Sequence, residues 1–75
     1  MEEKKIITIK KAILKNFDAV NYKAVIQISG SSTAYLEGVT TARNLSAAEM
    51  IPGRKLIVIF WDENNPSEAV VMGVY

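Results

Sequence analysis

The 75-residue sequence contains no cysteine and no histidine. Disulfide bridges and thiol redox chemistry are therefore excluded, as are zinc sites built from Cys and His ligands. The imidazole that most often acts as a general base is missing too, and no Ser-x-x-Lys arrangement offers a lysine in its place. The sequence therefore predicts a protein that is not an enzyme and that carries no metal or cofactor.

Long apolar runs are also missing. No run approaches the roughly 20 residues that a membrane-spanning helix needs, and the N-terminal segment is charged and interrupted at Thr8, unlike a signal peptide. We therefore expect a soluble, cytoplasmic protein without a membrane partner.

No charge of one sign dominates, since 9 Lys and Arg residues face 8 Asp and Glu residues. Up to Lys23 there are six lysines and three acidic residues, a net +3; the remaining three basic and five acidic residues give −2. This bulk charge does not favour nucleic acid or an anionic membrane. The uneven distribution either keeps the chain soluble or lets basic and acidic ends of different subunits attract each other.

One loop, Asp62–Glu68, is rich in oxygen donors and is the best candidate for a calcium site. Counted from Asp62, however, the sixth position lacks the glycine of such loops, and the twelfth position is Gly73 instead of a bidentate glutamate. A solvated hairpin loop is the better prediction.

Residues typical of β-strands dominate the sequence. Their β-branched and aromatic side chains gather in short runs separated by Gly, Pro, Asn, Asp and Ser. In the clearest run Ala24, Ile26 and Ile28 share one face, as in an antiparallel strand with one buried side. We predict five strands, at about Lys4–Leu14, Tyr22–Ser29, Thr33–Thr41, Arg54–Trp61 and Ala69–Tyr75.

The first predicted strand changes phase. Ile7 and Ile9 share one face, and Leu14 joins it only if the register shifts by one residue at Lys10 and Lys11. The sequence therefore predicts a β-bulge at these two lysines. A second bulge or sharp bend is predicted at Gly38 in the third strand.

The only predicted helix is a short one between the third and fourth strands. Ser46 and Glu49 have the spacing of a capping box, and Pro52 and Gly53 end the segment. A helix this short does not hold itself together, so apolar side chains must anchor it in the core. We predict this role for Leu45, Met50 and Ile51.

This order of elements predicts a single all-β domain over residues 1–75. Three strands, a short helical turn and two more strands follow the order of the five-stranded antiparallel OB barrel. An SH3-like barrel, the fallback, places its helical turn before the last strand.

The last third of the chain, "IPGRKLIVIFWDENNPSEAVVMGVY", combines Gly53, an apolar strand at Leu56–Trp61, the polar loop Asp62–Glu68, and a final strand with Val70, Val71, Met72 and Gly73. In this order it resembles the end of the small OB-type barrel domains of contractile phage tails, in baseplate hub, spike and assembly proteins. The resemblance implies a non-enzymatic subunit or adaptor in a symmetric assembly, located in the virion if phage-derived, with other virion or assembly proteins as partners.

The six residues Leu56–Trp61 are all apolar, although one small domain readily buries only one face of a strand. A contiguous exposed apolar face of this size is typical of a docking surface. The sequence therefore predicts a homo-oligomer, with an interface formed by Ile57, Ile59, Trp61, Val70 and Met72, although which face of the fourth strand points inward stays open.

The alternative function is binding of single-stranded nucleic acid. OB barrels bind single strands with basic side chains that follow the phosphates and aromatic rings on which bases stack. Lys23, Tyr35 and Arg43 are the residues that would contribute. The near-neutral charge and the absence of aromatic residues on the outward face of the second strand favour the assembly prediction.

Overall fold

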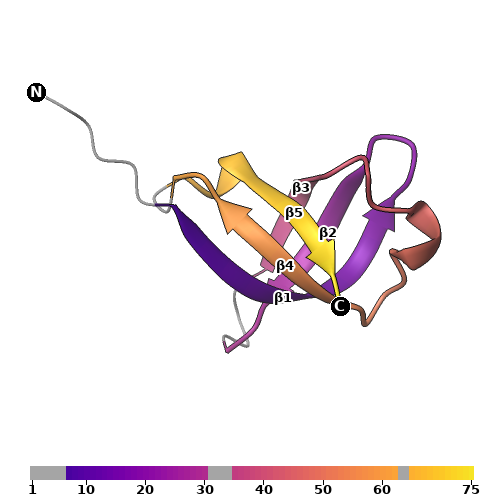
Figure 1. Cartoon of the computed structure of the whole chain (residues 1–75), viewed down its shortest axis with the longest axis horizontal. Helices are drawn as coiled ribbons and strands as arrows, with labels where there is room; N and C mark the ends of the chain where they lie inside the picture. Colours follow the sequence, from indigo (N-terminus) through magenta and orange to yellow (C-terminus); the bar gives the residue numbers. More distant parts are fainter. Residues whose placement is uncertain (1–6, 31–34, 63–64) are drawn as a thin grey trace, which may run out of the picture.

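The computed structural model describes residues 7–30, 35–62 and 65–75. These residues form the all-β architecture predicted from the sequence, with a short helical turn between the third and fourth strands (Figure 1). The predicted strand starts at Lys4 and Thr33 lie outside the described residues. The elements are β1 (Thr8–Asp18), β2 (Lys23–Ile28), β3 (Tyr35–Thr41), the 3-10 turn η1 (Ala47–Glu49), β4 (Lys55–Phe60), the 3-10 turn η2 (Pro66–Glu68) and β5 (Ala69–Val74).

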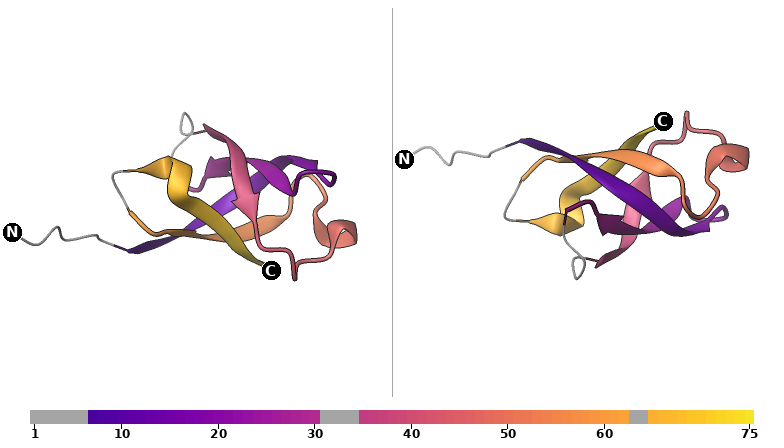
Figure 2. Two further views of the ribbon diagram at one scale, coloured as in Figure 1. Left: turned by 90° about the horizontal axis from the view of Figure 1, so that it is seen from above. Right: turned by 90° about the horizontal axis from the view of Figure 1, so that it is seen from below.

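The five strands close into a barrel in the order β1-β2-β3-β5-β4. Figure 1 shows β4 between β1 and β5, with β2 and β3 behind them, and Figure 2 shows the same arrangement from above and below. Neighbouring strands are antiparallel except β3 and β5, which pair in parallel over a seam of Thr40–Thr41 and Val70–Val71. The predicted OB-like barrel is confirmed, with one parallel pair that makes the sheet mixed.

The barrel interior is filled by every second residue of the strands, as the period of a β-strand requires. The alternation predicted for β2 is confirmed, since Ala24 and Ile26 are buried and Ile28 packs against them. The buried core consists of Ala12, Leu14, Ala24, Ile26, Val39, Met50, Leu56, Val58, Phe60, Ala69 and Val71.

The phase of β1 differs from the prediction. Ile7 and Ile9 point outward, and β1 pairs with β4 in continuous register from Thr8 to Ile13, so the bulge predicted at Lys10 and Lys11 was wrong. The opposite phase is possible because the inward series starts with Thr8 and Lys10 near the mouth of the barrel, where the Lys10 ammonium lies 5.2 Å from the centre of the Phe60 ring. The register shift of β1 against β2 lies further on, between Leu14 and Asn16.

The bulge predicted at Gly38 is confirmed. One residue of β2 separates Ala24 from Ile26, whereas two residues of β3, Glu37 and Gly38, separate their partners. Gly38 has φ +63°, in the left-handed region that glycine adopts without a steric penalty. The extra residue bends β3, and this curvature helps a small sheet to close.

Turn η1 is anchored at fewer points than predicted. Ser46 is its N-cap and accepts a hydrogen bond from the Ala48 amide at 3.2 Å. Met50 is buried and Leu45 packs against the core, but Ile51 is exposed, so its predicted anchoring role was wrong. Met50 is the last buried residue of this segment, and the chain then bends through the exposed Pro52 and Gly53 into β4.

The turn from β1 to β2 is built around Asp18. Its carboxylate accepts a hydrogen bond from the Asn21 side-chain amide at 2.9 Å, and from the backbone amides of Asn21 at 3.3 Å and Val20 at 3.0 Å. The strand extends to Asp18, beyond its predicted end at Leu14, so the turn covers residues 19–22 and includes Tyr22, which has φ 53°. Such a φ is uncommon for a bulky residue, and this one is held by its hydroxyl, which donates to the Leu45 carbonyl at 2.6 Å.

These hydrogen bonds predict a pH dependence. They favour the charged carboxylate, the Asn21 side-chain bond most strongly, and hold the pKa of Asp18 below its ordinary 3.8. A lowered folded-state pKa stabilises the fold above the unfolded pKa, and this contribution is lost as the pH falls through the folded pKa. We expect the stability difference between the wild type and Asp18→Asn to be present at neutral pH and to vanish at acid pH in urea titrations. A difference that grows on acidification would contradict this assignment.

Thr41 has a buried, unsatisfied hydroxyl group among the described residues. Its side chain is 2% exposed, and within the described residues its hydroxyl has no hydrogen-bond partner. An unsatisfied buried hydroxyl costs about 1 to 3 kcal/mol. Thr41→Val keeps the branched shape and removes the hydroxyl, so we expect the free energy of unfolding in urea to rise by about 1 kcal/mol. A lower value would mean that a buried water satisfies this hydroxyl.

Candidate oligomer interface

The structure decides which face of β4 points inward. Leu56, Val58 and Phe60 are buried in the barrel, whereas Ile57 is 37% exposed, Trp61 is 45% exposed and Ile59 is half-buried. The two predicted interface residues of β4, Ile57 and Ile59, and Trp61 directly after the strand therefore lie on the outer face. Within the described ranges, the chain buries only the inner side of this apolar strand.

The two predicted interface residues of β5 lie on the same outer side. Val70 pairs with Ile59 and is half-buried, whereas Val71 is fully buried in the core. Between Val71 and Gly73 the register with β4 shifts, which makes Met72 an extra, outward residue that is 42% exposed. The bulge thus adds an apolar side chain to the outer surface.

β1 extends this surface across a third strand. The predicted interface did not include Ile9; in the structure this residue pairs with Ile59 and is 67% exposed. Ile9, Ile59 and Val70 therefore form an apolar row across β1, β4 and β5. The outer apolar face, as we call it, consists of Ile9, Ile57, Ile59, Trp61, Val70 and Met72.

The flanks of the outer apolar face are charged. Lys11 lies beside Ile57 and Lys55 begins β4, so the exposed side chains at this end are basic. Asp62 follows Trp61 and the exposed Glu68 precedes β5, so these two side chains, among the described residues, make the other end acidic. Apolar residues in the middle with charged residues around them are typical of protein interfaces.

The structure does not bring all three residues predicted for nucleic-acid binding together, because Tyr35 lies apart from the other two. Lys23 donates to the Thr40 hydroxyl at 3.0 Å, at one end of the β2–β3 ladder, while Tyr35 pairs with Gln27 near the other end. Thr40 and Tyr35 are five residues apart on β3, which corresponds to roughly 16 Å along a strand. Tyr35 therefore lies far from the Thr40 hydroxyl that Lys23 contacts.

Arg43 lies near Lys23, at the same end of the ladder. Its guanidinium carbon is 5.4 Å from the centre of the Tyr22 ring, and the other contact of that ring is edge-to-face with Phe17 at 5.0 Å between centroids. The ring thus packs at the rim of the barrel. Arg43 and Lys23 lie together there, and we call this pair the basic corner.

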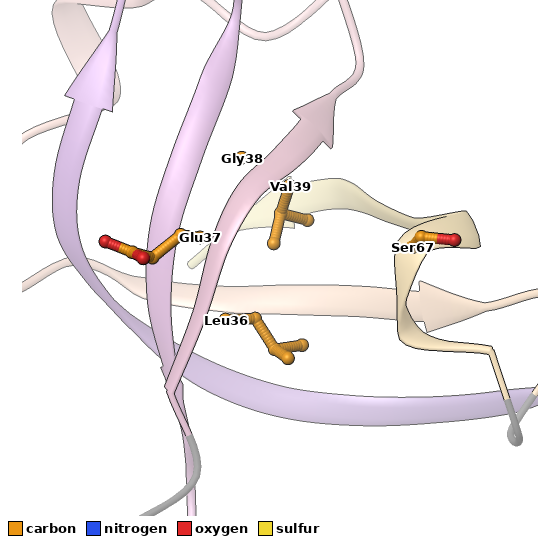
Figure 3. A pocket seen from close by; sticks show the side chains of 5 residues that line it. All are labelled: Leu36, Glu37, Gly38, Val39 and Ser67. Carbon is orange, nitrogen blue, oxygen red and sulfur yellow. The ribbon is translucent and has the colours of Figure 1, made fainter.

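Two hollows lie along β3. The first, of about 250 Å³, lies between β3 and η2 and is lined by Leu36, Glu37, Gly38, Val39 and Ser67. Figure 3 shows the Leu36 and Val39 side chains in the space between β3 and η2, and the Glu37 carboxylate turned away from Ser67. The second hollow, on the β2 side, includes Asp18, Lys23 and Glu37. Neither combines a nucleophile with a base, and the carboxylates weaken the attraction for phosphates.

The described ranges hold no group of three or more acidic, His or Cys side chains placed to bind a metal ion. Glu63 and Asn64 of the candidate calcium loop lie outside these ranges. No helix within residues 7–30, 35–62 and 65–75 has the length and apolar character needed to cross a bilayer.

Comparisons with known proteins identified no relative of this chain. No protein-family model, curated protein or solved structure matches the chain.

Proposed function

We propose that this protein is a small non-enzymatic β-barrel module that self-associates through the outer apolar face. The observation that carries the proposal is the apolar row Ile9, Ile59 and Val70, flanked by Ile57, Trp61 and Met72, on the outside of a barrel whose core is already full. Monomeric soluble proteins seldom leave such a contiguous surface in water.

The energetics support a second copy of the chain as the occupant. Burying one large apolar side chain contributes roughly 1.5 to 3 kcal/mol, and a two-fold interface buries each residue twice. A surface of six such residues therefore offers enough free energy to offset the cost of association, estimated at about 4 to 15 kcal/mol. Polar ends of opposite charge suit the same surface on another copy.

Contact through the face of the sheet is favoured over pairing along its edge. Among the residues that the structure describes, β2 pairs with β1 from the Ser29 amide and the Lys11 carbonyl onward, and the start of β1 pairs with β4. The start of β1 carries Lys10 and Lys11, and lysines near the edge of a sheet discourage the addition of a further strand.

The mass of the particle in solution tests the proposal. Light scattering at micromolar concentration is expected to give a multiple of the monomer mass. On dilution the measured mass should fall towards that of the monomer. A monomer mass over the whole accessible concentration range would rule out self-association as the role of this face.

The resemblance of the last third of the chain to OB-type domains of phage tails extends the proposal. We propose a phage or prophage origin, with other virion or assembly proteins as further partners. Detection of the chain in purified particles by mass spectrometry would support this origin, and its detection only in the free cytoplasmic fraction would count against it.

A second proposal, single-stranded nucleic-acid binding, is supported by the basic corner formed by Lys23 and Arg43. This corner has two positive charges, but the carboxylates of Glu37 and Asp18 line the same hollow as Lys23 and weaken the attraction for phosphates. Fluorescence anisotropy with a labelled single strand at low salt tests this proposal. Binding that weakens with salt and with Arg43→Ala would support it, and no binding at low salt would exclude it.

A further inference from the structure

The outer apolar face has a direction. At the start of β4 its flank carries the exposed lysines Lys11 and Lys55, and at the end of β4 it carries Asp62 and the exposed Glu68. Near the basic end, the Arg54 guanidinium lies 3.8 Å from the Glu49 carboxylate, so these two opposite charges offset each other. Lys10 lies on the other face of β1, over the Phe60 ring.

Two sheets that pack face to face usually keep their strands within about 30° of one another. A two-fold pair of outer apolar faces therefore has two arrangements. If the axis runs along β4, Lys55 faces Lys55 of the partner subunit, and the acidic ends also face each other. If the axis runs across β4, each basic end faces an acidic end. Like charges that face each other across an interface are costly, and this cost selects between the two arrangements.

We infer that the second copy packs with its β4 antiparallel to the first, so that Lys55 faces Glu68 and Asp62 of the partner subunit. This inference rests on the proposed function, since it specifies how the proposed pair is oriented. The hydrophobic contact depends little on orientation, because Ile57, Ile59 and Trp61 are apolar along the whole length of the outer apolar face. The charged ends therefore set the direction.

The absence of cysteine permits a clean test by site-specific cross-linking. Lys55→Cys and Glu68→Cys are prepared separately, and each is treated with a short bismaleimide that spans about 10 Å, the spacing of packed sheets. Equal amounts are then mixed, left to exchange subunits and treated in the same way. Light scattering on each sample shows whether it is assembled, and Val20→Cys mixed with Lys55→Cys is the control, since Val20 lies in the turn between β1 and β2.

The antiparallel pair predicts a cross-linked dimer in the mixture of Lys55→Cys and Glu68→Cys, and none above background in either variant alone or in the control. Cross-linking of each variant with itself would overturn the orientation and leave the proposed function standing. An assembled sample without any cross-link would also overturn the orientation. A monomer in light scattering would instead remove the proposed function on which the inference rests.

Discussion

Replacing Trp61 with glutamate is expected to dissociate the assembly while the barrel stays folded. Trp61 is 45% exposed on the outer face and contributes nothing to the buried core, so a charge at this position is tolerated by the monomer. In a two-fold pair the change removes two apolar contacts and places two charges in the interface. At roughly 1.5 to 3 kcal/mol per side chain, the dissociation constant should rise by at least about 100-fold.

Sedimentation equilibrium measures this change, and circular dichroism shows whether the fold is intact. Val20→Glu is the matched control, because Val20 is 86% exposed in the turn between β1 and β2 and lies off the outer apolar face. It introduces the same charge and should leave the assembly unchanged. Equal effects of the two substitutions would show that net charge, and not this face, governs association. Unfolding by Trp61→Glu would show that Trp61 supports the core.

Leu56→Ala is expected to have the opposite pattern of effects. Leu56 is fully buried, one position before the exposed Ile57 on the same strand. Truncation of a buried leucine to alanine costs about 2 to 5 kcal/mol, which is a large part of the roughly 4 to 11 kcal/mol expected for the whole chain. The midpoint of urea unfolding should fall sharply or the chain should unfold outright.

The neighbouring Ile57→Ala is the control for this second prediction. It truncates a side chain on the outer face, so it should weaken association and leave the unfolding of the monomer nearly unchanged. Unfolding is compared at concentrations at which both variants are monomeric, because assembly itself stabilises the folded state. If Ile57→Ala destabilised the monomer as much as Leu56→Ala, the inner and outer faces of β4 would not be separate.

The barrel could be predicted from the sequence because each local signal agreed with the others. The alternation in β2, the glycine at the β3 bulge, the short capped turn after β3 and the two apolar strands at the end all point to the same small closed sheet. The parallel pairing of β3 with β5 could not be read from these signals. It extends over two residues on each strand and arises only when the sheet closes.

The candidate interface was predicted in part. The excess of apolar residues in β4 was evident in the sequence, but a period of two does not say which face is inside. The contribution of Ile9 was missed because the register shift predicted at Lys10 and Lys11 placed Ile9 on the same face as Leu14, whereas the continuous register of β1 places it on the opposite face. A stricter reading of Ala12 and Leu14, which lie in phase with Thr8 and Lys10, was the signal that could have placed Ile9 outside.

The fluorescence of Trp61 tests most directly whether a second copy covers the outer apolar face. The chain has a single tryptophan, so its emission reports on this face alone. With rising protein concentration the emission is expected to shift to shorter wavelength and to become protected from iodide quenching, in step with the increase in mass. The contrary result is an emission and a quenching that remain typical of an exposed indole at every concentration, even where the mass increases. This result would show that the face remains in water and would contradict the proposed role.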